Sequence, residues 1–211
     1  MRTPYKIADE AAARITTKIH REFRHNRLAL FDEMNTVQTK SHVNKLYKKV
    51  FNEVFKEFLK IIAPITQEIY AEALDMGFDG DIRDLDEAWI EEFFEEYNPV
   101  TKYVFANEVE RKKMRLFESL VADKAGRMQS YKTAERLLIK QIKQYAIELE
   151  DAITKSVYKD IKVEYVEWHS EDDHRTCGTC KDLNGQVFKL DEAPDKQHYA
   201  CRCWLTPARV K

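Results

Sequence analysis

All four cysteines of this chain fall near its C-terminus, at Cys177, Cys180, Cys201 and Cys203. His198 lies in the same stretch, which therefore gathers five side chains of the kinds that bind zinc. The stretch has few large apolar residues, and a module of about 45 residues cannot hold a rigid fold by burial alone. We therefore expect this tail to need a metal or a covalent cross-link.

Glycine and proline are scarce, at five residues each in a chain of 211. An ordinary β-sandwich or barrel needs frequent Gly and Pro turn signals, so this scarcity argues against both. Hydrophobic residues make up 44% of the chain, which excludes a strongly disordered protein. The composition predicts a mainly α-helical fold.

The first nine residues have no apolar stretch behind their charges, so the sequence predicts no signal peptide. No segment approaches the roughly 18 consecutive apolar residues that a membrane helix requires. We therefore expect folding in a reducing cytosol, where cysteines serve metal binding or catalysis more often than structural disulfides.

Two segments have the apolar periodicity of long helices. From Ser41 onward an apolar residue recurs at every fourth position, and from about Ser130 to Tyr158 the spacing is three or four. Pro64 is expected to kink or restart the first helix, and Gly77 to cap its C-terminus.

Further helices are predicted from about Asp9 to Phe31 and from Asn98 to about Gly126. An acidic helix is predicted after Asp84, which would act as N-cap with Glu87 three residues later.

The nearly neutral net charge conceals opposite blocks. Residues 1–60 hold 13 Lys and Arg against 7 Asp and Glu, whereas residues 61–98 hold 1 against 12. The first helix carries a basic stripe, which either is a solvated face or contacts a polyanion such as DNA. Its members are Arg14, Lys18, Arg21, Arg24 and Arg27. The acidic segment either faces a partner or neutralises the basic helices of its own chain.

The apolar period changes near residue 160. Lys162–Trp168 alternates as a β-strand does, and Asn184-Gly185 is a turn signal before a second short strand, Gln186–Leu190. The sequence therefore predicts a long-helix body over residues 1–159 and a small α+β zinc-knuckle module over residues 160–211.

The five metal-binding side chains of the tail form two groups, Cys177-x-x-Cys180 and His198-x-x-Cys201-x-Cys203. A structural Zn²⁺ takes four Cys or His ligands and contributes on the order of 10–16 kcal/mol to folding in small modules. We expect Cys177, Cys180 and two of the other three to bind Zn²⁺. The spacing does not decide which of these three is left out. A disulfide or free-thiol state and a degenerate site without metal are the alternatives.

Two other functions compete with a structural zinc module. Cys177 and Cys180 could form the dithiol of a thiol-redox enzyme, although that chemistry places the pair at the N-terminus of a helix that follows a strand. The zinc module could instead serve nucleic-acid binding, with the basic stripe and the Lys and Arg of residues 102–143 on phosphates.

Other residues of the tail occur in a fixed order around the metal-binding pairs. The string is Trp168, Asp173, Arg175-Thr176-Cys177, Cys180, Leu183-Asn184-Gly185, Val187-Phe188, His198, Cys201-Arg202-Cys203 and Pro207. It resembles the C-terminal domain of phage minor head proteins, the Mu F-like head morphogenesis family.

The resemblance implies a non-enzymatic bacteriophage minor head protein, present in the virion at the head interior or portal vertex and made in the host cytoplasm. Its partners would be the portal protein and other head proteins, with packaged DNA as a further possibility and no membrane contact. Cys177, Cys180, His198, Cys201 and Cys203 would hold its module together around structural Zn²⁺. Arg175 and Arg202 would orient carboxylates or contact a partner.

Overall fold

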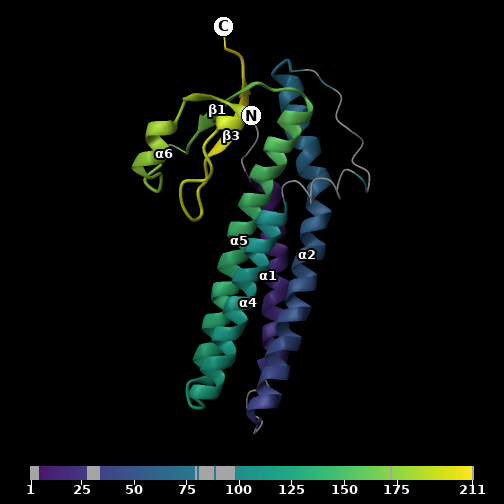
Figure 1. The fold of residues 1–211 in the computed structure, drawn as a ribbon, viewed down its shortest axis with the longest axis vertical. Helices are drawn as coiled ribbons and strands as arrows, with labels where there is room; N and C mark the ends of the chain where they lie inside the picture. The colour runs from purple at the N-terminus through teal and green to yellow at the C-terminus, as the bar shows by residue number, and fades with distance from the viewer. Residues whose placement is uncertain are drawn as a thin grey trace. The chain divides into compact units, whose positions relative to one another are not determined.

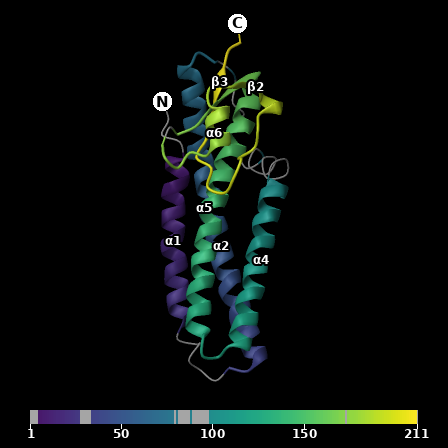
Figure 2. The same cartoon turned by 90° about the vertical axis from the view of Figure 1, so that its left-hand side faces the viewer.

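The computed structural model describes residues 5–27, 34–78, 80, 88, 98–171 and 173–210. These residues form long helices followed by a small C-terminal sheet, which confirms a mainly helical fold (Figures 1 and 2). The chain divides into two compact units. The helical unit comprises Asp9–Lys60 and Val100–Tyr145, and the sheet unit comprises Met1–Ala8, Ile61–Pro99 and Ala146–Lys211. The predicted domain boundary near residue 160, between a helical body and a separately folding module, stays a prediction.

Four helices contribute segments to the helical unit: α1 (Lys6–Asn26), α2 (Thr36–Asp75), α4 (Asn98–Ala122) and α5 (Arg127–Asp160). Aromatic rings join them in the core. The ring of Phe23 on α1 lies 4.9 Å from that of Tyr131 on α5, and the ring of Phe58 on α2 lies 4.8 Å from that of Tyr145. The apolar stripe predicted along α2 is buried throughout, at Leu46, Val50, Val54, Phe58 and Ile62.

Helix α2 begins five residues earlier than predicted because a capping box precedes it. The side chain of Asn35 accepts from the Gln38 amide, and the Gln38 side chain accepts from the Asn35 amide, both at 2.9 Å. The predicted cap at Gly77 is confirmed: at φ 79°, its amide donates to Leu74 and the next amide to Ala73, the two bonds of a Schellman motif. The expected restart at Pro64 does not occur, since α2 continues through it as one helix.

The other helix ends differ from prediction by a few residues. Helix α1 ends at Asn26, and residues 28–31 of its predicted extension lie outside the described residues. Helix α4 ends at Ala122 instead of Gly126, because the carboxylate of Asp123 accepts from the Gly126 amide at 2.9 Å and forms a tight turn into α5. The acidic helix predicted after Asp84 also lies outside the described residues. None of the described helices is long and apolar enough to cross a membrane.

The sheet unit contains an antiparallel sheet in the order β2-β1-β3. Its strands are β1 (Tyr165–His169), β2 (Val187–Lys189) and β3 (Trp204–Ala208), with a helix α6 (Gly178–Leu183) between β1 and β2 and a 3-10 turn η2 (Leu190–Glu192) after β2. Val166 in the central strand pairs with Phe188 and with Pro207. The two predicted strands are therefore present. β3, which contains a proline, was not predicted.

The basic stripe on α1 is partly neutralised within the helical unit. Lys18 lies 2.6 Å from the Glu57 carboxylate and 3.5 Å from that of Glu53, and Arg14 lies 3.9 Å from Glu57. Arg24 and Arg27 are exposed. Hydrogen bonds from Lys18 and Lys60 lower the pKa of Glu57 to about 2, because they favour its charged form.

We predict that Glu57→Gln lowers the free energy of unfolding by about 1–2 kcal/mol at pH 7, because a nearly buried carboxylate loses two ammonium partners. Since the folded-state pKa lies below the ordinary value, this contribution is present above about pH 4.5 and is lost as the pH falls toward 2. Urea unfolding of the wild-type chain and of Glu57→Gln, from pH 7 down to pH 2, measures this difference in unfolding free energy. A difference that does not shrink on acidification would contradict the assignment. Glu53→Gln, at the longer contact, is the matched control.

Candidate metal site

The sheet unit brings all five predicted metal-binding side chains together. Cys177 is the N-cap of α6 and Cys180 lies in its first turn, whereas His198, Cys201 and Cys203 belong to the segment that leads into β3. Cys180, Cys201 and Cys203 are buried, Cys177 is half-buried and His198 is exposed. The donors therefore form a buried base with an accessible rim, through which an ion can enter.

Cys180 is the common member of two groups of donors. Cys177, Cys180 and His198 form one group, and Cys180, Cys201 and Cys203 form the other; the donor atoms within each lie within 4.8 Å of one another. In the described part of the chain, no other set of three Cys, His or acidic side chains meets this criterion. All four cysteines are free thiols, so the structure contains no disulfide.

Two distances from Cys180 fit the edges of a zinc tetrahedron. With Zn–S near 2.3 Å and Zn–N near 2.0–2.1 Å, tetrahedral geometry places two sulfurs about 3.8 Å apart and sulfur and nitrogen about 3.5 Å apart. The sulfur of Cys180 lies 3.7 Å from that of Cys201 and 3.4 Å from Nε2 of His198. The donor set and its spacing therefore fit Zn²⁺.

The imidazole of His198 is oriented as a metal ligand should be. Its Nδ1 lies 2.9 Å from the carbonyl oxygen of Tyr199, while Nε2 faces Cys180. Metal-binding histidines commonly donate one ring N–H to a carbonyl, which fixes the tautomer and leaves the other nitrogen free to coordinate. The contact with Tyr199 therefore leaves Nε2 as the ring nitrogen that is available to a metal.

The buried thiols have widely separated pKa values. A hydrogen bond from Cys203 lowers the pKa of Cys201 to about 4, and burial raises the pKa of Cys180 to about 12. The bond that favours the Cys201 thiolate also raises the pKa of Cys203. Without a cation, one thiolate is therefore stabilised by its neighbours, whereas a bound metal would stabilise several and release protons.

Arg202, between Cys201 and Cys203 in sequence, fixes the loop before α6. Its guanidinium lies 2.7 Å from Asp173 and 3.3 Å from Glu171. Hydrogen bonding to Arg202 holds the pKa of Asp173 below its ordinary value. Arg175 lies 3.4 Å from the same carboxylate. Both arginines thus contact the same carboxylate in the loop before α6.

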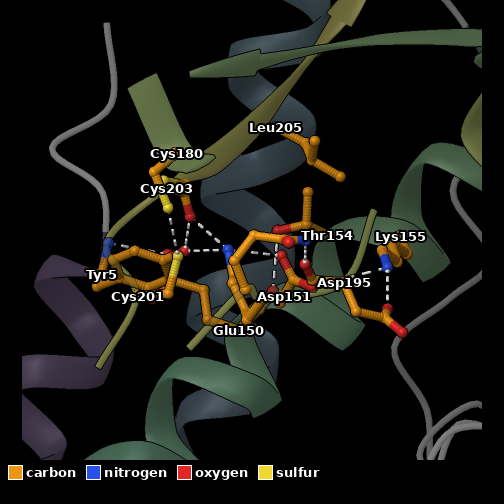
Figure 3. Close-up of polar contacts among 12 residues, drawn as sticks. Tyr5, Glu150, Asp151, Thr154, Lys155, Cys180, Asp195, Cys201, Cys203 and Leu205 are labelled. Carbon is orange, nitrogen blue, oxygen red and sulfur yellow. Dashed lines mark hydrogen bonds and ion pairs between the residues drawn. The ribbon is translucent and has the colours of Figure 1, made fainter. Parts of the chain in front are cut away.

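The base of the site includes residues that sequence reasoning missed. Figure 3 shows Tyr5 beside Cys201 and Cys203, next to Glu150 and Asp151 from α5. The Tyr5 hydroxyl donates to the carbonyl of Cys203, and the ammonium of Lys196 lies 2.9 Å from Asp151. No local motif reveals Tyr5, because it lies at the opposite end of the chain. For Lys196 the sequence did contain a signal, because this lysine lies only two residues before the candidate ligand His198.

A separate pocket of about 540 Å³ lies in the sheet unit. It is lined by Glu68, Ala71, Glu72, Asp75 and Met76 from the end of α2, Glu167 and His169 from β1, and Trp204 and Thr206 from β3. The His169 ring stacks on Trp204 at 5.4 Å, and its Nε2 lies 2.7 Å from the Thr206 hydroxyl. Glu68 and Asp75 belong to the acidic segment 61–98, and neither has a basic partner among the described residues. These two acids therefore do not neutralise a described basic helix of their own chain.

We predict that Co²⁺, used as a spectroscopic substitute for Zn²⁺, gives a tetrahedral thiolate spectrum with the wild-type chain. Cys180→Ser should abolish this spectrum, because Cys180 belongs to both donor groups. Single substitutions of Cys177, His198, Cys201 and Cys203 should each perturb it except at the one position that does not coordinate.

The same series tests the structural role of the metal. We predict that Cys177→Ser combined with Cys180→Ser removes the metal and exposes residues 160–207 to protease. Helical circular dichroism should be largely kept, because none of the five candidate ligands lies in the helical unit. If metal content and protease resistance survive both substitutions, the zinc assignment is wrong.

Comparison with known proteins identifies one family. Residues 105–206 match the family model described as phage Mu protein F like protein. No curated protein and no solved structure matches significantly. The matched region begins within α4, contains all five metal-binding candidates and ends within β3. This match to the phage Mu protein F like family confirms the resemblance found in the tail.

Proposed function

We propose that this chain is a non-enzymatic minor head protein of a bacteriophage, in which a zinc-stabilised C-terminal module docks on other head proteins at the portal. The family match supports a role in head morphogenesis. The observation that carries the zinc assignment is the position of Cys180, whose neighbours Cys201 and His198 lie at tetrahedral distances.

Zn²⁺ in this module would have a structural role. Catalytic zinc sites keep one position open for water, whereas structural sites are filled by four protein ligands. Five candidate ligands surround this site, so the protein can complete the shell without water. Three of the sulfurs are buried, and the ion would hold together α6 and the segment before β3.

One observation favours the thiol-redox alternative: Cys177 caps the N-terminus of α6 and its sulfur accepts from the Cys180 amide at 3.4 Å, which lowers the pKa of Cys177. However, the helix has only six residues, and Cys180 is in contact with Cys201 and His198 as well. A redox pair needs no such additional donors. The arrangement therefore supports metal binding more strongly.

The nucleic-acid alternative has weaker support from the helical unit. Arg14 and Lys18 contact the carboxylate of Glu57, and Arg21 lies 3.6 Å from that of Glu22, which neutralises part of the basic stripe. Its C-terminal members Arg24 and Arg27 are exposed. We expect only weak DNA binding. A steep loss of DNA affinity with rising salt would favour the alternative.

We predict that the chain co-purifies with the portal ring of its phage when the two are expressed together. Zinc removal by chelator, or Cys180→Ser, should abolish the association, because either disorders the docking module. Glu57→Gln, in the helical unit, is the control and should leave the association intact. Size-exclusion chromatography measures the association with the portal ring, and metal analysis of the eluted protein measures its zinc content. A zinc-loaded chain that never associates with the portal would contradict the portal assignment.

A further inference from the structure

Lys196 is a buried cation whose three N–H donors all have partners. Its side chain is 8% exposed and its ammonium lies 2.9 Å from the carboxylate of Asp151. The ammonium also donates to the hydroxyl of Tyr5 and to the carbonyl of Cys203. The Asp151 carboxylate is itself largely buried and stabilises the ammonium as its counterion. Lys196 is therefore a fixed positive charge inside the sheet unit.

Tyr5 completes this arrangement from the other end of the chain. It is 5% exposed, its amide donates to Glu150 at 3.1 Å, and its hydroxyl donates to the Cys203 carbonyl (Figure 3). The Lys196 ammonium also lies 5.1 Å from the centre of the Tyr5 ring and 5.8 Å from that of Trp168, within range of cation–π attraction. Tyr5 lies outside the family-matched residues 105–206.

Both residues act on the candidate zinc ligands. Lys196 precedes His198 by two residues, and it shares the Cys203 carbonyl with Tyr5. A Zn²⁺ with three or four thiolate ligands carries a net negative charge, which a nearby buried ammonium offsets.

We propose that Lys196 and Tyr5 are positioning residues for the zinc site, and that metal binding is thereby coupled to anchoring of the segment that begins at Tyr5. The proposal rests on the zinc site under the proposed function. Lys196 offsets the charge of the thiolates, while Tyr5 fixes the backbone of Cys203. Since coupling between two binding events is reciprocal, zinc must tighten the attachment of Tyr5 by the factor by which Tyr5 tightens zinc.

The first test measures zinc affinity by competition with a chromophoric chelator in the full-length chain. Loss of a residue that supports metal ligands typically lowers metal affinity 10–100-fold. We therefore predict such a loss for Tyr5→Phe, which keeps the ring, and for Lys196→Met. Lys196→Arg should restore most of the affinity because it retains the charge.

Matched controls separate positioning from general stability. Tyr47→Phe removes a buried hydroxyl from the helical unit, and Lys18→Met removes an ion-paired lysine there, so neither should change zinc affinity. The Co²⁺ spectrum should keep its tetrahedral form in Tyr5→Phe, since no ligand is removed. A purely structural role would lower thermal stability without changing the affinity of the folded chain for zinc.

The second test uses the reciprocal effect. In the wild-type chain, zinc should slow amide hydrogen exchange at residues 5–8 by a factor similar to the affinity loss in Tyr5→Phe. Unchanged zinc affinity in Tyr5→Phe, or unchanged exchange at residues 5–8 on adding zinc, would overturn the proposal. A wild-type chain that binds no zinc would instead refute the zinc site itself, so the two failures are distinguishable.

Discussion

The arrangement of the C-terminal module depends on the convergence of sulfur and nitrogen donors around Cys180. Helix α6 has six residues and β2 has three, too few to fix a fold by their own burial. Cys180 connects α6 to the segment before β3 through Cys201 and His198. These donors bring polar and ionisable groups into a buried site, and a metal bound under the proposed function would stabilise the same contacts that define the module.

Around this centre, hydrogen bonds from neighbouring and from distant residues restrict the candidate ligands. The Tyr199 carbonyl orients His198, and Arg202 ties its neighbours to Asp173. Lys196 and Tyr5 both donate hydrogen bonds to the backbone carbonyl of Cys203. A site that is supported on several sides holds its ligands near the productive geometry before the ion arrives, which reduces the ordering that binding requires.

The sequence was informative where a local signal exists. The long helices, the Gly77 cap and the grouping of five donors follow from periodicity, a positive-φ position and ligand spacing. The capping box at Asn35 and Gln38 was visible but overlooked. No strand was predicted at β3, which contains Pro207; a proline is tolerated there because β3 lies at the edge of the sheet. Tyr5 could not be predicted, because its role depends on a tertiary contact across nearly the whole chain.

Pro207 has a consequence for a protein of a family involved in head assembly. β3 lies at one edge of the sheet, and at Pro207 this edge has no N–H to offer an incoming strand, while the opposite edge, β2, is only three residues long. Exposed edges can recruit strands from neighbouring molecules and cause aggregation. Two copies of this module would therefore pair poorly through the edges of their sheets.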